Sequence, residues 1–248
     1  MRLSIVIPVF NEVNYLEEVL YRIQSVKLPD VDMEIIIVDD CSKDGTEKLL
    51  RSWSSGLDKG ILYHEYSENR RIELKRLKIF FQDQNMGKGA AVKKGFSEAS
   101  GDIVLVQDAD LEYDPKDYSK LIRPILDQKV DVVYGSRFSK GKPENIYLTN
   151  YLANRFLTKI SNLFTGLKLT DMETCYKAFS KDVIGKIDIH EQRFGIEPEI
   201  TSKISKLKLK VVEIPVSYKG RKNSDGKKIR MKDGLRAVWC IIKYNLFK

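Results

Sequence analysis

The sequence predicts an α/β protein built on a doubly wound, mostly parallel sheet. Five short apolar runs, at residues 3–7, 35–38, 77–81, 103–106 and 130–134, have the length and β-branched content of buried strands. Helical patterns at residues 15–26, 46–53 and 89–99 separate the first four runs. Strands that alternate with helices favour parallel pairing, because the crossover between parallel strands is usually a helix. With 248 residues, the chain is long enough for one such domain with a sizeable core.

The boundaries of these elements carry their own signals. Asp44 or Thr46 is positioned to cap the second helix, and a Gly-rich segment opens the third. Residues 54–76 are rich in Ser, Gly and charged side chains, which is typical of a surface elaboration rather than of core.

The second half of the chain contains one long amphipathic pattern. Residues 146–168, taken approximately, predict a helix with a broad apolar face interleaved with basic side chains. A basic loop is expected at about residues 219–234. We expect one domain over residues 1–234, which includes this helix and loop, followed by a basic amphipathic segment at residues 235–248.

The composition, 42% apolar and 31% charged, is that of an ordinary soluble globular protein. Cys41, Cys175 and Cys240 lie far apart without metal-ligand spacing, which favours free thiols in a reducing compartment. The chain enters its first strand directly, without the pattern of a signal peptide. Its apolar stretches fall short of the roughly 18 to 20 residues of a membrane span.

The net charge of +8 is unevenly distributed. Residues 201–248 hold 14 Lys and Arg against 3 Asp and Glu, whereas residues 1–200 hold 29 basic and 32 acidic side chains. A nearly neutral body with a basic end suggests an anionic partner at that end. Nucleic acid, an anionic membrane surface and a phosphorylated acceptor all qualify, and a solvated basic tail is the alternative.

The acidic cluster Asp108-Ala109-Asp110 directly follows the apolar run at 103–106. Two carboxylates one residue apart at a strand end can converge on one hard cation, and oxygen ligands suit Mg²⁺ or Mn²⁺. Such a cation usually holds a diphosphate. The cluster therefore points to nucleotide chemistry.

Two further strand ends carry polar motifs. Asp39 and Asp40 follow the second run, where an acid can accept from a ribose hydroxyl or a base N–H, or simply cap the turn. Lys88 lies in a Gly-rich loop that opens a helix, a setting that favours anions, so it is expected to reach a phosphate. The loop lacks the spacing of a Walker motif.

Five segments, taken together and in order, closely resemble the family 2 glycosyltransferases, which have the GT-A fold. They are residues 7–12, 38–46, 85–89, 108–110 and 135–138. The resemblance covers almost the whole chain. It implies a nucleotide-sugar donor, a divalent cation and inversion at the anomeric carbon.

The resemblance also implies roles for individual side chains. The positions that match the nucleoside site are Pro8, Phe10, Glu12 and Asp40, and the expected nucleotide-sugar contacts further include Asp39, Lys88, Asp108, Ala109 and Asp110. Asp108 and Asp110 match the metal motif, and Glu112 matches a further ligand position in some members.

The later part of the chain resembles one branch of this family, the enzymes that glycosylate polyprenyl phosphates, such as dolichyl-phosphate mannose and glucose synthases. The segments that carry the likeness are residues 171–179, 194–199 and 213–221, followed by a basic loop at 224–230. In that branch an arginine and the loop behind it close over the donor diphosphate and the acceptor phosphate. The residues expected to bind the acceptor phosphate are Arg137, Arg221, Lys227 and Lys228.

Two departures from family patterns matter. Processive members carry Gln-x-x-Arg-Trp, which Gln192-Arg193-Phe194 does not reproduce, and this argues against a polysaccharide synthase. The branch often has Ser-Gly-Phe-Arg where this chain ends its segment on Lys177. Lysine keeps the charge but not the planar fork of arginine.

The sequence leaves the acceptor and the donor open. A polyprenyl phosphate is largely dianionic at neutral pH and needs positioning by Lys88, Arg137 and Arg221 rather than a base. A glycan hydroxyl would need a carboxylate base, for which Asp171 comes first and Glu173 second. UDP-glucose is slightly preferred over GDP-mannose as donor. A non-catalytic sugar-nucleotide-binding protein is the alternative of another class.

The expected partners are a nucleotide sugar, a polyprenyl phosphate and a membrane surface. The helix at 146–168 and the segment at 235–247 are expected in the membrane interface, at the cytoplasmic face, unless they form core or a homo-oligomer contact. Nucleic acid is supported only by the basic end of the chain and is not expected as a partner.

Overall fold

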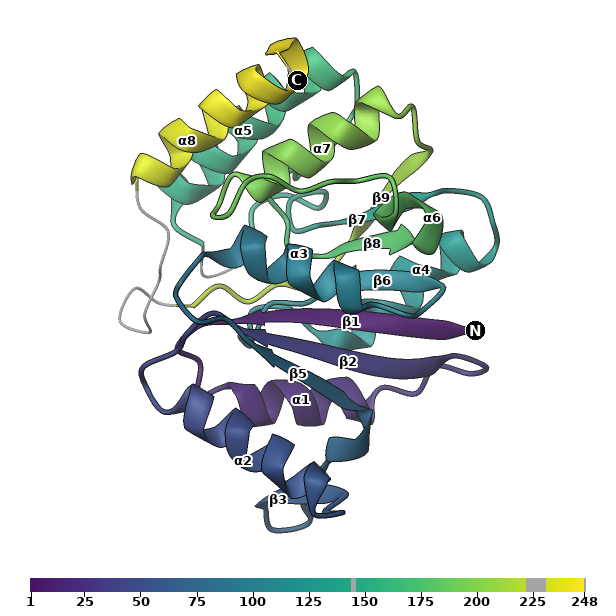
Figure 1. Ribbon diagram of the computed structural model, residues 1–248. Coiled ribbons are helices and arrows are strands. Elements are labelled where there is room, and N and C mark those ends of the chain that lie inside the picture. The colour runs from purple at the N-terminus through teal and green to yellow at the C-terminus, as the bar shows by residue number, and fades with distance from the viewer. Residues whose placement is uncertain (144–145, 222–230, 248) are drawn as a thin grey trace.

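Seven strands form the central sheet in the order β5-β2-β1-β6-β8-β7-β9. The computed structural model describes residues 1–143, 146–221 and 231–247 (Figure 1). The strands of the sheet are β1 (Arg2–Val9), β2 (Asp32–Asp39), β5 (Leu77–Phe81), β6 (Ile103–Val106), β7 (Val132–Ser136), β8 (Lys177–Ser180) and β9 (Val211–Pro215). A separate hairpin pairs β3 (Tyr63–Ser67) with β4 (Arg70–Glu73).

The sheet is parallel except at β8, which runs antiparallel to both β6 and β7. The five predicted strands are confirmed as β1, β2, β5, β6 and β7, although β7 begins at Val132 rather than at residue 130. The sequence did not predict β8 and β9. The first begins with Lys177, and the second contains Glu213 and ends at Pro215, so neither is a continuous apolar run.

Helices flank the sheet. They are α1 (Leu16–Ser25), α2 (Thr46–Asp58), α3 (Lys88–Glu98), α4 (Tyr118–Leu126), α5 (Leu148–Thr165), α6 (Lys181–Ile184), α7 (Ile196–Lys206) and α8 (Met231–Ile242), with short turns η1 (Leu74–Arg76) and η2 (Pro115–Asp117) and a π-helical turn η4 (Lys243–Phe247). Helix α3 packs on β1 and β2, whereas α5, α7 and α8 pack on one another at one end of the molecule (Figure 1). The predicted helices at 15–26, 46–53 and 89–99 are confirmed as α1, α2 and α3.

Two local expectations need correction. The segment at 54–76 is not merely a surface elaboration, because Ile72 and Leu74 are buried in the core. The N-cap of α2 is Gly45, whose φ of 105° lies in the left-handed region. The carboxylate of Asp44 instead accepts from the backbone N–H and the hydroxyl of Thr46.

The helix expected at 146–168 is confirmed, and the amphipathic segment at the end of the chain is also mainly helical. Helix α5 lies within the predicted range 146–168, and α8 begins at Met231, so the expected boundary at residue 234 falls inside a helix. Helix α8 packs on α5 and α7, which belong to the rest of the domain. None of the described helices is long and apolar enough to cross a membrane.

Candidate active site

The candidate site lies where the carboxyl ends of the parallel strands meet. In the sheet register, Val9 at the end of β1 pairs with Asp39 of β2, and Val6 pairs with Val106 at the end of β6. The loops after β1, β2, β6, β7 and β9 therefore all emerge at the carboxyl-terminal end of the strands. Ligands bind at this end in open parallel sheets, and the expected site residues follow these strands.

The carboxylates of the acidic motif are compensated by two cations from distant loops. Lys88 Nζ lies 3.0 Å from Asp108 Oδ1, and Arg221 Nη2 lies 2.8 Å from Asp110 Oδ2. The guanidinium of Arg221 also donates to both oxygens of Glu12, at 3.1 Å each. The structure thus brings together the loops after β1, β6 and β9.

Glu112 contacts the loop after β9 rather than a second carboxylate. Its Oε2 accepts from the hydroxyl of Tyr218 at 2.8 Å, and its Oε1 accepts from the backbone N–H of Arg221 at 2.7 Å. Both of its oxygens therefore hold the segment that delivers the Arg221 side chain.

Asp108, Asp110 and Glu112 offer carboxylate oxygens, which are the type of ligand that a hard divalent cation prefers. Burial raises the pKa of Asp110 to about 7, and the neighbouring Asp108 and Glu112 charges add to this shift. A cation of charge two would relieve that repulsion, and the ligands are all oxygens. As they stand, the carboxylates pair with Lys88 and Arg221, and no three acidic, His or Cys side chains of the described residues cluster around one metal position.

Lys88 is the first residue of α3 and lies between two acids. Besides Asp108, its Nζ contacts Glu197 at the start of α7, at 3.1 Å. The preceding Gly87 has a φ of 97°, which favours glycine. Lys88 thus stands at the start of a helix, where a cation and the helix dipole together suit a phosphate once Lys88 leaves its acidic partners.

Asp40 shapes the loop that leads to α3. Its Oδ1 accepts from Gln82 Nε2 at 3.0 Å and from the N–H of Met86 at 2.7 Å. Its Oδ2 accepts from Asn85 Nδ2 at 3.0 Å and from the N–H of Gly87 at 2.8 Å. A carboxylate offers about four lone-pair sites, so Asp40 is saturated here and orders the loop instead of presenting an acceptor to a nucleoside.

Asp39, unlike Asp40, is not saturated with hydrogen-bond donors. It is fully buried, its Oδ2 accepts from the N–H of Ser42, and burial raises its pKa. Within the described part of the chain, its Oδ1 has no hydrogen-bond partner. Pro8 and Phe10 are half-buried at the end of β1, and Ala109 is buried. The nucleoside contacts of these residues stay predictions.

Arg137 and Asp171 form a buried bidentate ion pair. The Nε and Nη2 of Arg137 donate to the Asp171 carboxylate at 2.7 and 2.8 Å, and the backbone N–H of Arg137 adds a third bond at 3.0 Å. Asp171 is fully buried. Glu213 of β9 accepts from the backbone N–H groups of Thr170 and Asp171 and so fixes this segment.

Glu173 is partly buried and is influenced by the nearby charges of Glu197 and Lys177. Burial raises its pKa to about 8, and the charge of Glu197 adds to the shift. Its Oε1 lacks a hydrogen-bond partner among the described residues. Lys177 donates to the carbonyl of Thr174 and lies 5.0 Å from the centre of the Tyr134 ring. The raised pKa favours the protonated form of Glu173.

Sequence reasoning gave no role to several acids that organise the site. Glu197 holds Lys88, Glu213 holds the Asp171 segment, and Glu191 holds the C-terminal helix. Glu197 and Glu213 lie in segments that carried the family likeness, which was the available signal. Lys227 and Lys228, the other expected acceptor contacts, lie outside the described residues.

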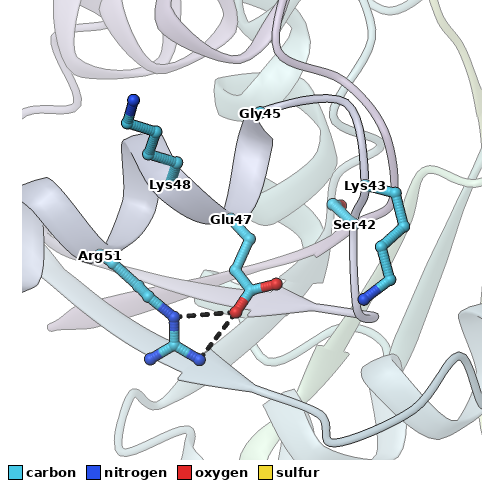
Figure 2. A pocket seen from close by; sticks show the side chains of 6 residues that line it. All are labelled: Ser42, Lys43, Gly45, Glu47, Lys48 and Arg51. Atoms are coloured by element: carbon cyan, nitrogen blue, oxygen red, sulfur yellow. Dashed lines mark hydrogen bonds and ion pairs between the residues drawn. The ribbon is translucent and has the colours of Figure 1, made fainter.

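A solvent-facing hollow of about 400 Å³ opens beside the turn after β2 (Figure 2). It is lined by Ser42, Lys43, Gly45, Glu47, Lys48 and Arg51. Figure 2 shows the Glu47 carboxylate paired with Arg51, so part of its basic charge is already neutralised. The hollow does not include the carboxylates of the acidic motif, and we assign it no catalytic role.

The chain was compared with known proteins. The family described as glycosyl transferase family 2 matches residues 4–188. The chain is 30% identical over 252 residues to a dolichol-phosphate mannosyltransferase of Pyrococcus furiosus, covering 98% of this chain and 64% of the other. It thus spans just under two thirds of that relative. It is 25% identical to an undecaprenyl-phosphate mannosyltransferase of Micrococcus luteus, covering 92% and 87% of the two chains.

Solved structures support the architecture. Glucosyl-3-phosphoglycerate synthase of Mycobacterium tuberculosis superposes with a TM-score of 0.69 at 19% identity, covering 98% of this chain and 80% of the other. At such low identity the likeness shows the fold alone, which is the GT-A fold that the sequence predicted. The same synthase has also been crystallised with Mn²⁺ and uridine diphosphate. Since the family match covers most of the chain, the protein belongs to glycosyl transferase family 2.

Proposed function

We propose that this enzyme transfers a hexose from a nucleotide sugar, UDP-glucose or GDP-mannose, to a polyprenyl phosphate, with inversion at the anomeric carbon. The names of the Pyrococcus and Micrococcus relatives support this class of acceptor. A dolichyl-phosphate β-glucosyltransferase of Dictyostelium discoideum, 29% identical over 232 residues, supports it as well.

The observation that carries the proposal is that the first candidate base, Asp171, is committed to a buried ion pair. Asp171 is fully buried and gives both oxygens to Arg137. Glu173 is partly buried, and desolvation raises its pKa to about 8, which favours its protonated form at neutral pH. A hydroxyl acceptor needs a base to remove its proton. A phosphomonoester, with a second pKa of about 6, carries its own nucleophilic oxygen at neutral pH.

The reaction then needs positioning more than proton transfer. A phosphate oxygen of the acceptor forms a bond to the anomeric carbon, the bond to the donor diphosphate breaks, and the nucleoside diphosphate leaves. Arg137 is held in one orientation by Asp171, and the Nη1 group outside that pair is suited to the acceptor phosphate. Lys88 and Arg221 are suited to stabilise the leaving diphosphate.

A divalent cation, Mg²⁺ or Mn²⁺, held by Asp108, Asp110 and Glu112, would act as a Lewis acid on the diphosphate. In the loop after β9, Tyr218 donates to Glu112 and Arg221 donates to Asp110. These contacts support a role for the loop beside the donor diphosphate.

We also propose that the enzyme works at the cytoplasmic surface of a membrane, where nucleotide sugars occur. Helices α5 and α8 each expose a stripe of apolar side chains. The stripes consist of Leu148, Leu152, Phe156 and Leu163 on α5, and of Leu235, Trp239, Leu246 and Phe247 on α8 and the turn after it. Apolar helix faces with tryptophan are typical of membrane interfaces.

Transfer of radiolabelled sugar tests the acceptor and the donor together. UDP-glucose, GDP-mannose and UDP-N-acetylglucosamine are each incubated with polyprenyl phosphate and Mn²⁺ or Mg²⁺, with a chelator as control. We expect label in the organic-extractable lipid only when the cation is present. Donor hydrolysis without a lipid product would overturn the acceptor and favour a hydroxyl instead.

A further inference from the structure

One buried carboxylate links the C-terminal helix and the turn after it to the loop before α7. Arg236 of α8 donates to Glu191 Oε2 at 2.6 Å, and Lys243 Nζ donates to Oε1 at 2.8 Å. The hydroxyl of Tyr244 also donates to Oε1, at 3.0 Å. The Glu191 side chain is only 4% exposed. Three donors from the end of the chain thus converge on one side chain of the loop before α7.

The backbone beside that carboxylate packs directly on the loop that opens α3. The carbonyl of Gln192 accepts from the N–H of Ala90 at 3.1 Å. A Cβ on Gly89 would overlap the carbonyl oxygen of Glu191, and a Cβ on Gly87 would lie 2.6 Å from the carbonyl oxygen of Gln192. The two loops are therefore in contact without intervening side chains, and a shift of one displaces the other.

The loop of Glu191 is fixed from its other side as well. The backbone N–H groups of His190 and Glu191 donate to the two oxygens of Glu199, at 2.8 and 2.7 Å. Glu199 is fully buried on α7. With its backbone held by α7 and its side chain held by α8, Glu191 joins the helices at one end of the molecule (Figure 1) to the segment that carries Lys88.

We propose that Glu191 is a positioning residue through which the C-terminal helix fixes residues 87–89, and thereby sets the affinity for the donor diphosphate. The proposal rests on the proposed function in one respect, that the donor phosphates bind at this end of α3. Glu191 itself contacts neither Lys88 nor the acidic motif. Its effect passes through the backbone contacts of its loop with Gly87, Gly89 and Ala90.

Glu191→Gln tests the proposal, and Glu34→Gln is its matched control. Glu34 is also a buried carboxylate with one lysine and two hydroxyl partners. It lies near the start of β2, at the end of the strands that is opposite the candidate site. We expect Glu191→Gln to raise the Kd for UDP or GDP and the donor KM about tenfold, since small misplacements near a reacting group are costly. We expect the acceptor KM to be unchanged, and Glu34→Gln to lower stability without changing either constant.

Tyr244→Phe and Lys243→Gln provide milder variants if Glu191→Gln folds poorly, and each should produce a smaller rise in the same Kd. Combining either with Glu191→Gln should add little, because the donors act through that carboxylate. Unchanged nucleotide affinity in folded variants would overturn the proposal, as would equal losses in the Glu34 control.

Hydrogen exchange separates this proposal from the proposed function. The backbone amides of residues 88–92 should exchange faster in Glu191→Gln than in wild type or Glu34→Gln, with no nucleotide present. If the wild type binds neither UDP nor GDP, the proposed function fails, but the exchange result still tests the contact. Equal exchange rates in wild type and Glu191→Gln would refute the positioning role independently.

Discussion

Replacing Asp171 with asparagine should destabilise the protein strongly, because it leaves a buried guanidinium without its countercharge. Both oxygens of Asp171 accept from Arg137, whose side chain is only 11% exposed. The amide of asparagine would place a donor against one of these donors. Breaking one side of a buried ion pair costs about 3 to 5 kcal/mol. Such a loss is a large share of the roughly 5 to 15 kcal/mol that stabilises a typical domain.

Urea unfolding measures the stability loss, and a double variant checks its cause. In Arg137→Met with Asp171→Leu, no buried charge is left, so this protein should be more stable than Asp171→Asn alone. Both should transfer sugar to lipid poorly, because Arg137 is displaced or absent, while donor hydrolysis persists. If Asp171→Asn is as stable as wild type and still abolishes transfer, Asp171 acts as a base and the reasoning from the ion pair is wrong.

Three further predictions concern separate parts of the molecule. Lys88→Met should weaken UDP or GDP binding about tenfold or more, measured by calorimetry, because a charge-assisted hydrogen bond to phosphate is lost. Burial alone would raise the pKa of Glu34, but hydrogen bonds from Ser4, Lys78 and Ser100 outweigh it and lower the pKa to about 2. The ionised carboxylate therefore stabilises the folded protein fully above pH 4.5, and this stabilisation is lost as the pH falls towards 2. Wild type should thus exceed Glu34→Gln by about 2 kcal/mol at pH 7, after allowance for solvent screening, and the two should converge near pH 2 in urea unfolding. Phe156→Ser combined with Trp239→Ser should abolish flotation of the protein with anionic lipid vesicles. It should not lower stability, since both side chains are more than half exposed. Unchanged flotation together with loss of a dimer in light scattering would show instead that this face binds a second copy of the chain.

The sequence predicted the parts of the fold that depend on local pattern. The strands with continuous apolar runs and the helices with an apolar periodicity or a Gly-rich start were found because their signals lie within each segment. Strand β8 was missed because it lies between β6 and β7 and pairs antiparallel with both, an arrangement that depends on the whole sheet. Its first residue, Lys177, is a buried lysine that contacts the carbonyl of Thr174 and the ring of Tyr134 on β7.

The candidate site was predicted as a set of residues but not as a set of pairings. The sequence pattern placed Asp108 and Asp110 at the end of a strand, and the family resemblance implied that Arg221 acts beside them. It could not show that Asp171 pairs with Arg137, or that Asp40 is saturated by the loop before α3, because these contacts join residues 34 to 47 positions apart. Pairings of this kind depend on packing and burial, which decide whether a carboxylate is a base, a ligand or a counterion.

The two cations of the site can pair either with its carboxylates or with a bound diphosphate. Lys88 and Arg221 compensate the carboxylates of Asp108, Asp110 and Glu12 in the structure described. A donor diphosphate that draws these cations away would leave the carboxylates buried and uncompensated, which is costly. A divalent cation arriving with the diphosphate would restore the balance. The pairing of each acid with an internal cation therefore favours binding of nucleotide and metal together over binding of either alone.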